Sequence, residues 1–368
     1  MPNPSPAEMS LQPLGVAVAG LGFGEKVHLP ALAAAPDLEA VALWHPRQER
    51  LDSATAAHGL KGFSDWDALL ADPAVDAVII ATPPAPRFDL ARRALEAGKH
   101  LLLEKPIALH ADQARELQRL ALARGLSVAV DYEYRAVPLF MQAARLLQAG
   151  AVGTPWLVKL DWLMGSRADP QRGWNWYAQA DQGGGVIGAL GTHAMDMLAW
   201  LIGPLGAVQA LSSVSIKQRP HPDGGLAAVD ASDVSLLQTV AHWQGRQDLP
   251  VPAQVSLSSV SRNGRGFCLD VVGSSGSLLL SSTNQKDYVH GFELQHAPLG
   301  EPFRAVEADA DFAFPETWAD GRIAPVARVL GWWAESIRSG RPMLPGLAEG
   351  VASRVACDQA AGITLDLA

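Results

Sequence analysis

The chain has 368 residues, of which 48% are hydrophobic and 18% charged, and its formal net charge is −9 at pH 7. One hydrophobic core rarely grows to this length, so two domains are expected. The acidic balance, without a basic tract, argues against nucleic-acid partners and against an anionic membrane surface. Two distant cysteines, Cys268 and Cys357, exclude a disulfide framework and favour a reducing, cytoplasmic location.

The amino-terminal residues carry no recognisable targeting signal. Residues 1–12 are rich in proline and lack the basic and apolar regions of a secretory signal, so they predict a flexible tail. No uninterrupted apolar run approaches the roughly 20 residues of a membrane span. We therefore expect no membrane association.

The first third of the chain alternates short apolar runs with helical patterns. Strands are expected at 15–20, 38–44, 74–84, 100–104 and 126–131, and helices at 25–35, 86–97 and 111–124. Strands separated by helices in this way indicate βαβ units and a doubly wound parallel sheet of the Rossmann type. We predict an α/β dinucleotide-binding domain over residues 1–132.

The pattern changes after residue 150. The stretches "TPWLVKLDWLMG", "AQVSLSSVS" and "GFCLDVVG" follow one another as strands without helices between them, which is typical of an open, mainly antiparallel sheet. Helices are expected near 187–202, 325–339 and 347–361. Residues 133–368 thus predict an α+β domain for the substrate, and its open sheet face favours a homo-oligomer, a dimer or tetramer.

A glycine-rich turn, "GLGFGEKVHLP" at 20–30, joins the first strand to the first helix. Gly20 permits a tight turn, and Gly22, beside Phe23, lets the backbone approach a pyrophosphate at the helix N-terminus. Gly24 comes one residue earlier than the GxGxxG pattern requires. The turn predicts a dinucleotide site, and a ligand-free turn is the structural alternative.

The residues after the second strand bear on the choice of dinucleotide. NAD sites place an acid there for the ribose hydroxyls, whereas NADP sites place a cation for the 2′-phosphate. The sequence "LWHPRQER" supplies His45 and Arg47 and no acid until Glu49. We predict NADP as the preferred cofactor over NAD, with a plain surface turn as the alternative.

The strand at 100–104 runs directly into Glu104, Lys105 and Pro106. Ligands of open parallel sheets bind at the carboxyl ends of the strands, so this charged pair is either the floor of a site or an exit into solvent. Thr82 and Pro83 end the preceding strand of the pattern.

Polar and aromatic residues surround the helix expected near 187–202. His193 borders an apolar stripe of that helix, where a lone histidine is usually a satisfied core residue. It forms an HxxD pair with Asp196, but no further ligand cluster supports a metal. Trp174, Trp176 and Tyr177 lie in the preceding polar loop, and as a group they predict a wall for a sugar-like ring, although each alone could be core.

Together, "GLGFGEKVHLP", "VDAVIIATPP", "AGKHLLLEKP" and "GGGVIGALGTHAMDML" resemble the glucose–fructose oxidoreductase/inositol dehydrogenase (Gfo/Idh/MocA) family over nearly the whole chain. The resemblance implies that Pro106 follows a cis peptide and that Lys105 reaches the nicotinamide ribose and the substrate hydroxyl. It implies that His193 is the acid/base histidine and that Thr82 and Pro83 lie along the cofactor. The chain departs from the family pattern at Ala189, where an aspartate is frequent, and at Glu133, where an asparagine precedes Arg135.

The implied function is an NAD(P)-dependent oxidoreductase that interconverts a secondary alcohol and a ketone on a sugar, cyclitol or related polyol. Lys105 and His193 are the predicted catalytic residues. Two alternatives stay open: glycoside cleavage through transient oxidation with tightly held NAD, and a nucleotide-binding sensor without turnover.

Overall fold

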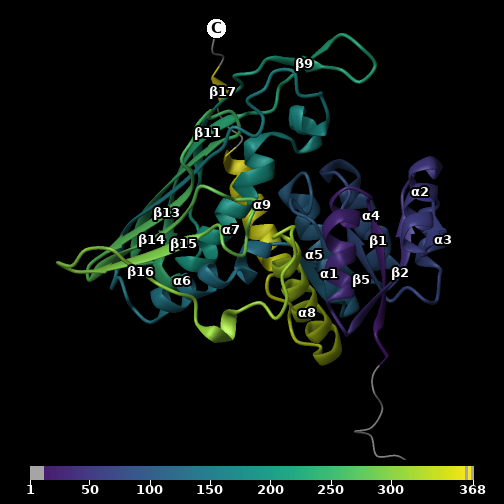
Figure 1. Ribbon diagram of the computed structural model, residues 1–368, viewed down its shortest axis with the longest axis horizontal. Helices are drawn as coiled ribbons and strands as arrows, with labels where there is room; N and C mark the ends of the chain where they lie inside the picture. The colour runs from purple at the N-terminus through teal and green to yellow at the C-terminus, as the bar shows by residue number, and fades with distance from the viewer. Residues whose placement is uncertain (1–11, 361–363, 366–368) are drawn as a thin grey trace, which may run out of the picture.

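A computed structural model describes residues 12–360 and the backbone of 364–365, and it contains two sheets with helices between and around them (Figure 1). The predicted tail lies, except for Gln12, outside the described residues. None of the described helices is long and apolar enough to cross a bilayer.

The first sheet has six parallel strands in the order β3-β2-β1-β4-β5-β6. Strands β4 and β5 are almost wholly buried because helices cover both faces of the sheet, which explains their continuous apolar sequences. The chain reverses the direction of strand order between β1 and β4, and ligands bind at such a switch point. The Rossmann-type prediction is confirmed. The strands are β1 (Leu14–Ala19), β2 (Leu38–Trp44), β3 (Lys61–Phe63), β4 (Ala77–Ile80), β5 (His100–Leu103) and β6 (Val128–Val130).

The helices of this domain differ in part from the prediction. The helix expected at 25–35 begins as a π-helical turn, η1 (Gly24–His28), and continues as the short α1 (Leu29–Ala33). Helix α2 (Gln48–His58) was not predicted, because it buries only Leu51 and Ala54 and its sequence lacks an apolar stripe. The remaining helices are α3 (Trp66–Leu70), α4 (Pro84–Glu96) and α5 (Ala111–Arg124).

The second sheet has nine strands in the order β16-β15-β14-β13-β7-β12-β11-β8-β17. It is mainly antiparallel, as predicted, but β7 pairs with β12 and β8 pairs with β17 in parallel. Strand β11 alternates buried and exposed residues, the pattern of a sheet with one covered face. The strands are β7 (Pro155–Leu163), β8 (Gln209–Ser213), β11 (Val234–His242), β12 (Pro250–Ser258), β13 (Gly266–Gly273), β14 (Gly276–Ser282), β15 (Glu293–Pro298), β16 (Arg304–Ala305) and β17 (Thr364–Leu365), with β9 (Gln218–Pro220) and β10 (Leu226–Ala228) as a separate hairpin.

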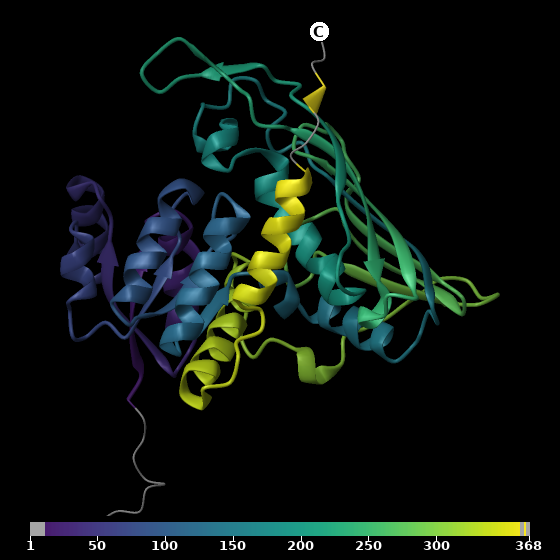
Figure 2. The same cartoon turned by 180° about the vertical axis from the view of Figure 1, so that it is seen from behind.

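Helices α6 (Pro138–Gln148) and α7 (Thr192–Leu201) pack on the inner face of the large sheet. Helix α8 (Ile323–Ser339) shares a core with strand β1 and so packs against the first domain, although it follows residue 132 in the chain. Helix α9 (Leu347–Ala360) contacts both α5 and α7 and thereby joins the domains, as the yellow helices of Figure 2 show.

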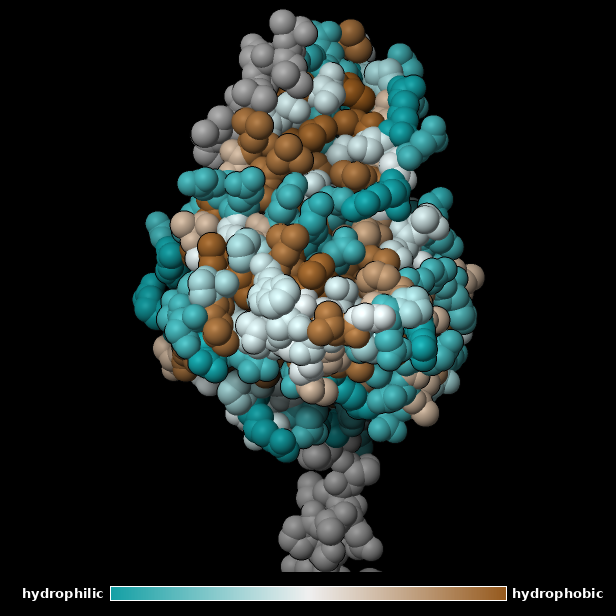
Figure 3. Space-filling view, turned by 90° about the vertical axis from the view of Figure 1, so that its left-hand side faces the viewer, coloured by the Kyte–Doolittle hydropathy of each residue, from teal (hydrophilic) through white to brown (hydrophobic). Residues whose placement is uncertain are grey.

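The outer face of the large sheet is open to solvent. Figure 3 views the molecule from this side, where hydrophobic side chains gather in the upper part among polar ones. The large apolar residues exposed on its strands include Leu157, Leu211, Leu236, Val240 and Val272.

Candidate active site

A cavity of about 1050 Å³ opens where the carboxyl ends of the parallel strands face the large sheet. Both domains line it, and the structure brings together most residues of the predicted site. The predicted residues in its wall are Gly20, Gly22, Phe23, His45, Arg47, Thr82, Pro83, Glu104, Lys105, Trp176 and His193. The cavity combines a nucleotide-binding edge with ionisable groups from the second domain.

The glycine turn fits a dinucleotide. Gly20 has φ of 101°, and a Cβ there would lie 2.7 Å from the carbonyl oxygen of Ala81, so only glycine is tolerated. At Gly22 no heavy atom lies within 4 Å of an added Cβ, which leaves the backbone open to a ligand. Gly24, also predicted for the cofactor site, does not line the cavity. Its added Cβ would meet a side-chain carbon of Val18 at 2.8 Å, so Gly24 serves the packing of η1 on β1.

The end of β2 carries two cations. Arg47 and Arg50 both border the cavity, and neither has a carboxylate partner in the part of the chain that the structure describes. The Nδ1 atom of His45 accepts a hydrogen bond from the backbone N–H of Arg47 at 3.1 Å, which orders the turn. Arg50 was not predicted; it lies in the first turn of α2, and Arg47 is the N-cap residue of that helix.

The ends of β4 and β5 are tied together by Arg87, for which the sequence supported no prediction. Its buried guanidinium donates to the backbone oxygens of Thr82, Glu104 and Pro106. The peptide bond between Lys105 and Pro106 is cis, as the resemblance implied. The hydroxyl of Thr82 is buried and has no hydrogen-bond partner among the described residues, which leaves it available to a ligand.

Behind Lys105 lies a buried polar cluster that the sequence did not reveal. The Nε2 atom of His28 lies 3.0 Å from Oε1 of Glu104 and 3.7 Å from Oδ2 of Asp131. Burial acts to raise the pKa of Glu104, but the hydrogen bond to His28 and the charges of His28 and Lys105 lower it to about 2. Burial and the charge of Glu104 raise the pKa of Asp131 well above its ordinary value.

The donor atoms of this cluster lie close enough to hold a metal ion. We assign none, because Glu104 is already bonded to His28 and the ammonium of Lys105 also acts on the two carboxyls. The carboxylate of Glu104 thus faces His28, although the residue borders the cavity.

His193 lies in the first turn of α7, which begins at Thr192 directly after a π-helical turn, η5 (Ile187–Gly191). Its ring meets the edges of two aromatic rings, with centroid distances of 5.1 Å to Tyr134 and 5.9 Å to Tyr132. Burial and then the charge of Lys105 lower the pKa of His193 well below its ordinary value. The imidazole is therefore neutral near pH 7.

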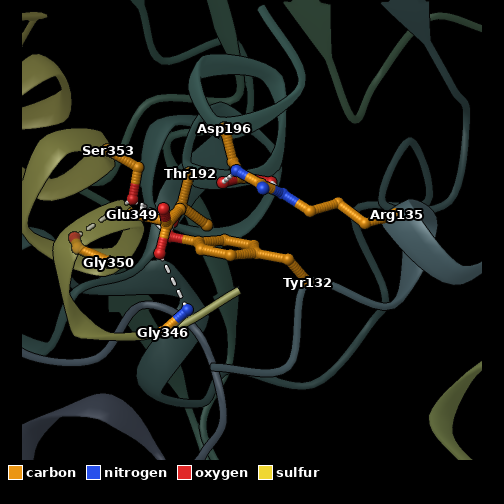
Figure 4. A network of polar contacts seen from close by, with 8 residues as sticks. All are labelled: Tyr132, Arg135, Thr192, Asp196, Gly346, Glu349, Gly350 and Ser353. Atoms are coloured by element: carbon orange, nitrogen blue, oxygen red, sulfur yellow. Dashed lines mark hydrogen bonds and ion pairs between the residues drawn. The ribbon is translucent and has the colours of Figure 1, made fainter. Parts of the chain in front are cut away.

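A network of polar contacts fixes the position of α7 (Figure 4). Arg135 binds both carboxylate oxygens of Asp196, at 2.8 and 2.6 Å, and this ion pair joins the segment after β6 to the helix of His193. The hydroxyl of Tyr132 is hydrogen-bonded to Ser353 of α9 and to Thr192. The helix is thus held from both sides.

The aromatic wall differs from the prediction. Trp176 borders the cavity, but Trp174 and Tyr177 do not. The indole N–H of Trp174 donates to the carbonyl oxygen of Ala228 in the β9–β10 hairpin, and Tyr177 lies against the guanidinium of Arg167 at 3.4 Å. Trp162, Tyr134 and Tyr288 complete the wall instead. They come from distant segments, and no local signal in the sequence groups them.

The comparisons with known proteins agree with this geometry. Residues 14–132 match the model of an oxidoreductase family with an NAD-binding Rossmann fold, and residues 144–361 match that family's C-terminal alpha/beta domain. The chain belongs to the Gfo/Idh/MocA family. It is an NAD(P)-dependent oxidoreductase whose first domain binds NAD(H).

Three relatives illustrate the family likeness. An uncharacterised oxidoreductase of Synechocystis sp. is 42% identical over 94% of this chain and 92% of its own. Levoglucosan dehydrogenase of Pseudarthrobacter phenanthrenivorans is 31% identical over 60% of this chain and 59% of its own. A solved structure of a levoglucosan dehydrogenase with NADH and levoglucosan has a TM-score of 0.81 and 25% identity, covering 95% of this chain and 96% of that one.

Proposed function

We propose that this oxidoreductase interconverts a secondary alcohol and a ketone on a sugar, cyclitol or related polyol. The observation that carries the proposal is that Lys105 and His193, from different domains, border one cavity with the glycine turn. Its aromatic wall suits the C–H face of a sugar ring, because aromatic side chains combine an apolar face with polar edges. The similarity to levoglucosan dehydrogenases supports a sugar-like substrate.

Lys105 and His193 have different roles at the reacting oxygen of the substrate. A bound NAD(P) supplies the hydride acceptor or donor. The ammonium of Lys105 donates a hydrogen bond to the substrate oxygen and stabilises the negative charge that develops there. His193 holds the same oxygen from the second domain, in a neutral form that can donate or accept a hydrogen bond.

We propose in addition that the enzyme prefers NADP to NAD. Arg47 and Arg50, in the segment after β2 where the 2′-phosphate would lie, form no ion pair with a carboxylate of the described residues, and charge-assisted hydrogen bonds to phosphate are strong. The dissociation constants of NADH and NADPH, measured by fluorescence titration, test this preference. Equal affinities, or tighter binding of NADH, would contradict it.

A screen for nucleotide reduction over sugars, cyclitols and other polyols, with NAD and NADP in parallel, tests the activity. Once a substrate is found, Lys105→Met and His193→Asn should each lower turnover by about 100-fold or more, the range for removing one hydrogen-bond donor that stabilises the charge on a reacting oxygen. His193→Asn should leave nucleotide affinity nearly unchanged. A copurifying nucleotide without net turnover would favour glycoside cleavage, and the absence of any chemistry would favour a sensor.

The open face of the large sheet is our proposed contact between copies of the chain. Exposed Leu211, Leu236 and Val240 give it apolar area on neighbouring strands. Sedimentation equilibrium should return the mass of a dimer or tetramer, and the mass of a single chain would refute the proposal.

Both cysteines are free, which suits the reducing cytoplasm that we propose as the location of the protein.

A further inference from the structure

Position 189 lacks the carboxylate that the resemblance led us to expect near His193, and Glu133 supplies one from another direction. Its side chain is only 7% exposed, and its Oε2 atom lies 3.8 Å from Nε2 of His193. That oxygen has no hydrogen-bond partner among the described residues, although the residue borders the cavity. A buried, unpartnered carboxylate oxygen is costly, so a polar group of the substrate is its expected partner.

The contact between Glu133 and His193 is built into the fold. Glu133 begins the 3-10 turn η2 (Glu133–Ala136), which two residues separate from the end of β6, and His193 lies in the first turn of α7. The same two elements are joined by the ion pair of Arg135 and Asp196, which appears in Figure 4. Two parallel contacts between one pair of elements fix their relative position. Glu133 is therefore held in place beside His193.

The charges around the two groups decide which of them holds a proton. Burial raises the pKa of Glu133 to about 7, while Lys105 opposes this rise, Glu104 adds to it and Arg322 opposes it weakly. His193, by contrast, has a pKa well below its ordinary value, because burial and the ammonium of Lys105 both disfavour imidazolium. A base works best when its pKa lies near the working pH. Glu133 meets this condition and His193 does not.

We propose that Glu133 is a catalytic residue of this site, and that its Oε2 atom takes the hydroxyl proton of the substrate while His193 orients the hydroxyl oxygen. The inference rests on the proposed function and assigns a residue to its proton step. An oxygen can lie about 2.8 Å from both Oε2 and Nε2, within ordinary hydrogen-bond distances. In oxidation the C–H electron pair leaves as hydride to the nicotinamide, and the O–H proton moves to the carboxylate. In reduction both steps run backwards.

Kinetics against pH separate Glu133 from His193. Glu133→Gln has the same shape but cannot take up the proton, so oxidation should fall about 100-fold or more, and the rise of kcat/KM with pH near 7 should disappear. His193→Asn should slow the reaction yet keep that rise. Glu133→Asp should recover part of the rate. Glu349→Gln, a half-buried glutamate that accepts from the backbone N–H of Gly346 outside the cavity, is the matched control. If Glu133→Gln keeps the rise and His193→Asn loses it, the proposal is wrong.

A measurement without substrate distinguishes failure of this proposal from failure of the proposed function. In ¹³C NMR of protein labelled at the glutamate carboxyl carbons, the signal that Glu133→Gln removes should titrate near pH 7, and Lys105→Met should raise its midpoint. A Glu133 carboxyl that stays ionised from pH 5 to 9 would overturn the assignment. A carboxyl that titrates as expected, in an enzyme that oxidises no polyol, would support the assignment and overturn the proposed function.

Discussion

The ion pair between Arg135 and Asp196 allows a quantitative prediction, because its two side chains are only 10% and 2% exposed. Arg135→Met keeps most of the apolar stem but removes the guanidinium, which also lies over the ring of Trp200, and it leaves Asp196 buried without a partner. Removing one member of a buried pair typically costs about 3–5 kcal/mol. Burial already raises the pKa of Asp196 against the pull of Arg135, so the orphaned carboxyl will take up a proton more readily. The loss should therefore grow as the pH rises from 5 to 8.

Urea unfolding, followed by tryptophan fluorescence, measures the loss for Arg135→Met, for Asp196→Leu and for the double variant. The double variant should be more stable than the sum of the two single losses predicts, because it leaves no buried charge. Turnover by Arg135→Met should also fall, since the pair holds Glu133 beside His193. Two small losses, below about 1 kcal/mol each, that simply add in the double variant would refute the reasoning.

Two further predictions follow from single side chains. Arg47→Ala and Arg50→Ala should each weaken the binding of NADPH about tenfold or more, because each removes a charged hydrogen bond, while the binding of NADH barely changes. The surface variant Arg115→Ala, as a control, should bind both nucleotides as the wild type does. Equal losses of affinity for both nucleotides would count against the 2′-phosphate contact. The pKa of Asp131 in the folded protein is raised well above 3.8, so the wild type should lose stability as the pH rises from about 4 through that folded value. Asp131→Asn needs no proton and should lose less stability over the same range, which urea unfolding midpoints at pH 5 and 8 would show. A difference in stability between the two proteins that does not depend on pH would contradict this sign.

The fold was predictable where the sequence shows a strong hydrophobic pattern. The buried runs of β4 and β5 are local signals, and they defined the parallel sheet. Helix α2 was missed because so little of it is buried. The packing of α8 against the first domain was not predicted, for another reason. An apolar stripe shows that a helix packs, but not which sheet it packs against.

The site was predictable where residues follow a strand end or a glycine turn. That rule located Gly20, Lys105 and Thr82, and it also applied to Glu133, which follows β6 just as Lys105 follows β5. Glu133 was noted only as a departure from a family pattern. Trp174 and Tyr177 were predicted in the wall of the site but do not border the cavity. Contacts with Ala228 and Arg167, which lie elsewhere in the sequence, determine where their side chains lie.

Three acidic residues, Glu104, Asp131 and Glu133, follow the adjacent ends of β5 and β6, and their neighbours give them different pKa values. Glu104 stays ionised because His28 and Lys105 favour its charge. Burial and the charge of Glu104 raise the pKa of Asp131, next to it, well above its ordinary value, which disfavours a further negative charge in the neighbourhood of Glu133. Had Asp131 been ionised, its repulsion would raise the pKa of Glu133 further, and the carboxylate needed as a base would be scarce at neutral pH. The raised pKa of Asp131 and the positive charge of Lys105 thus act in the same direction, and the proposed base function of Glu133 depends on both.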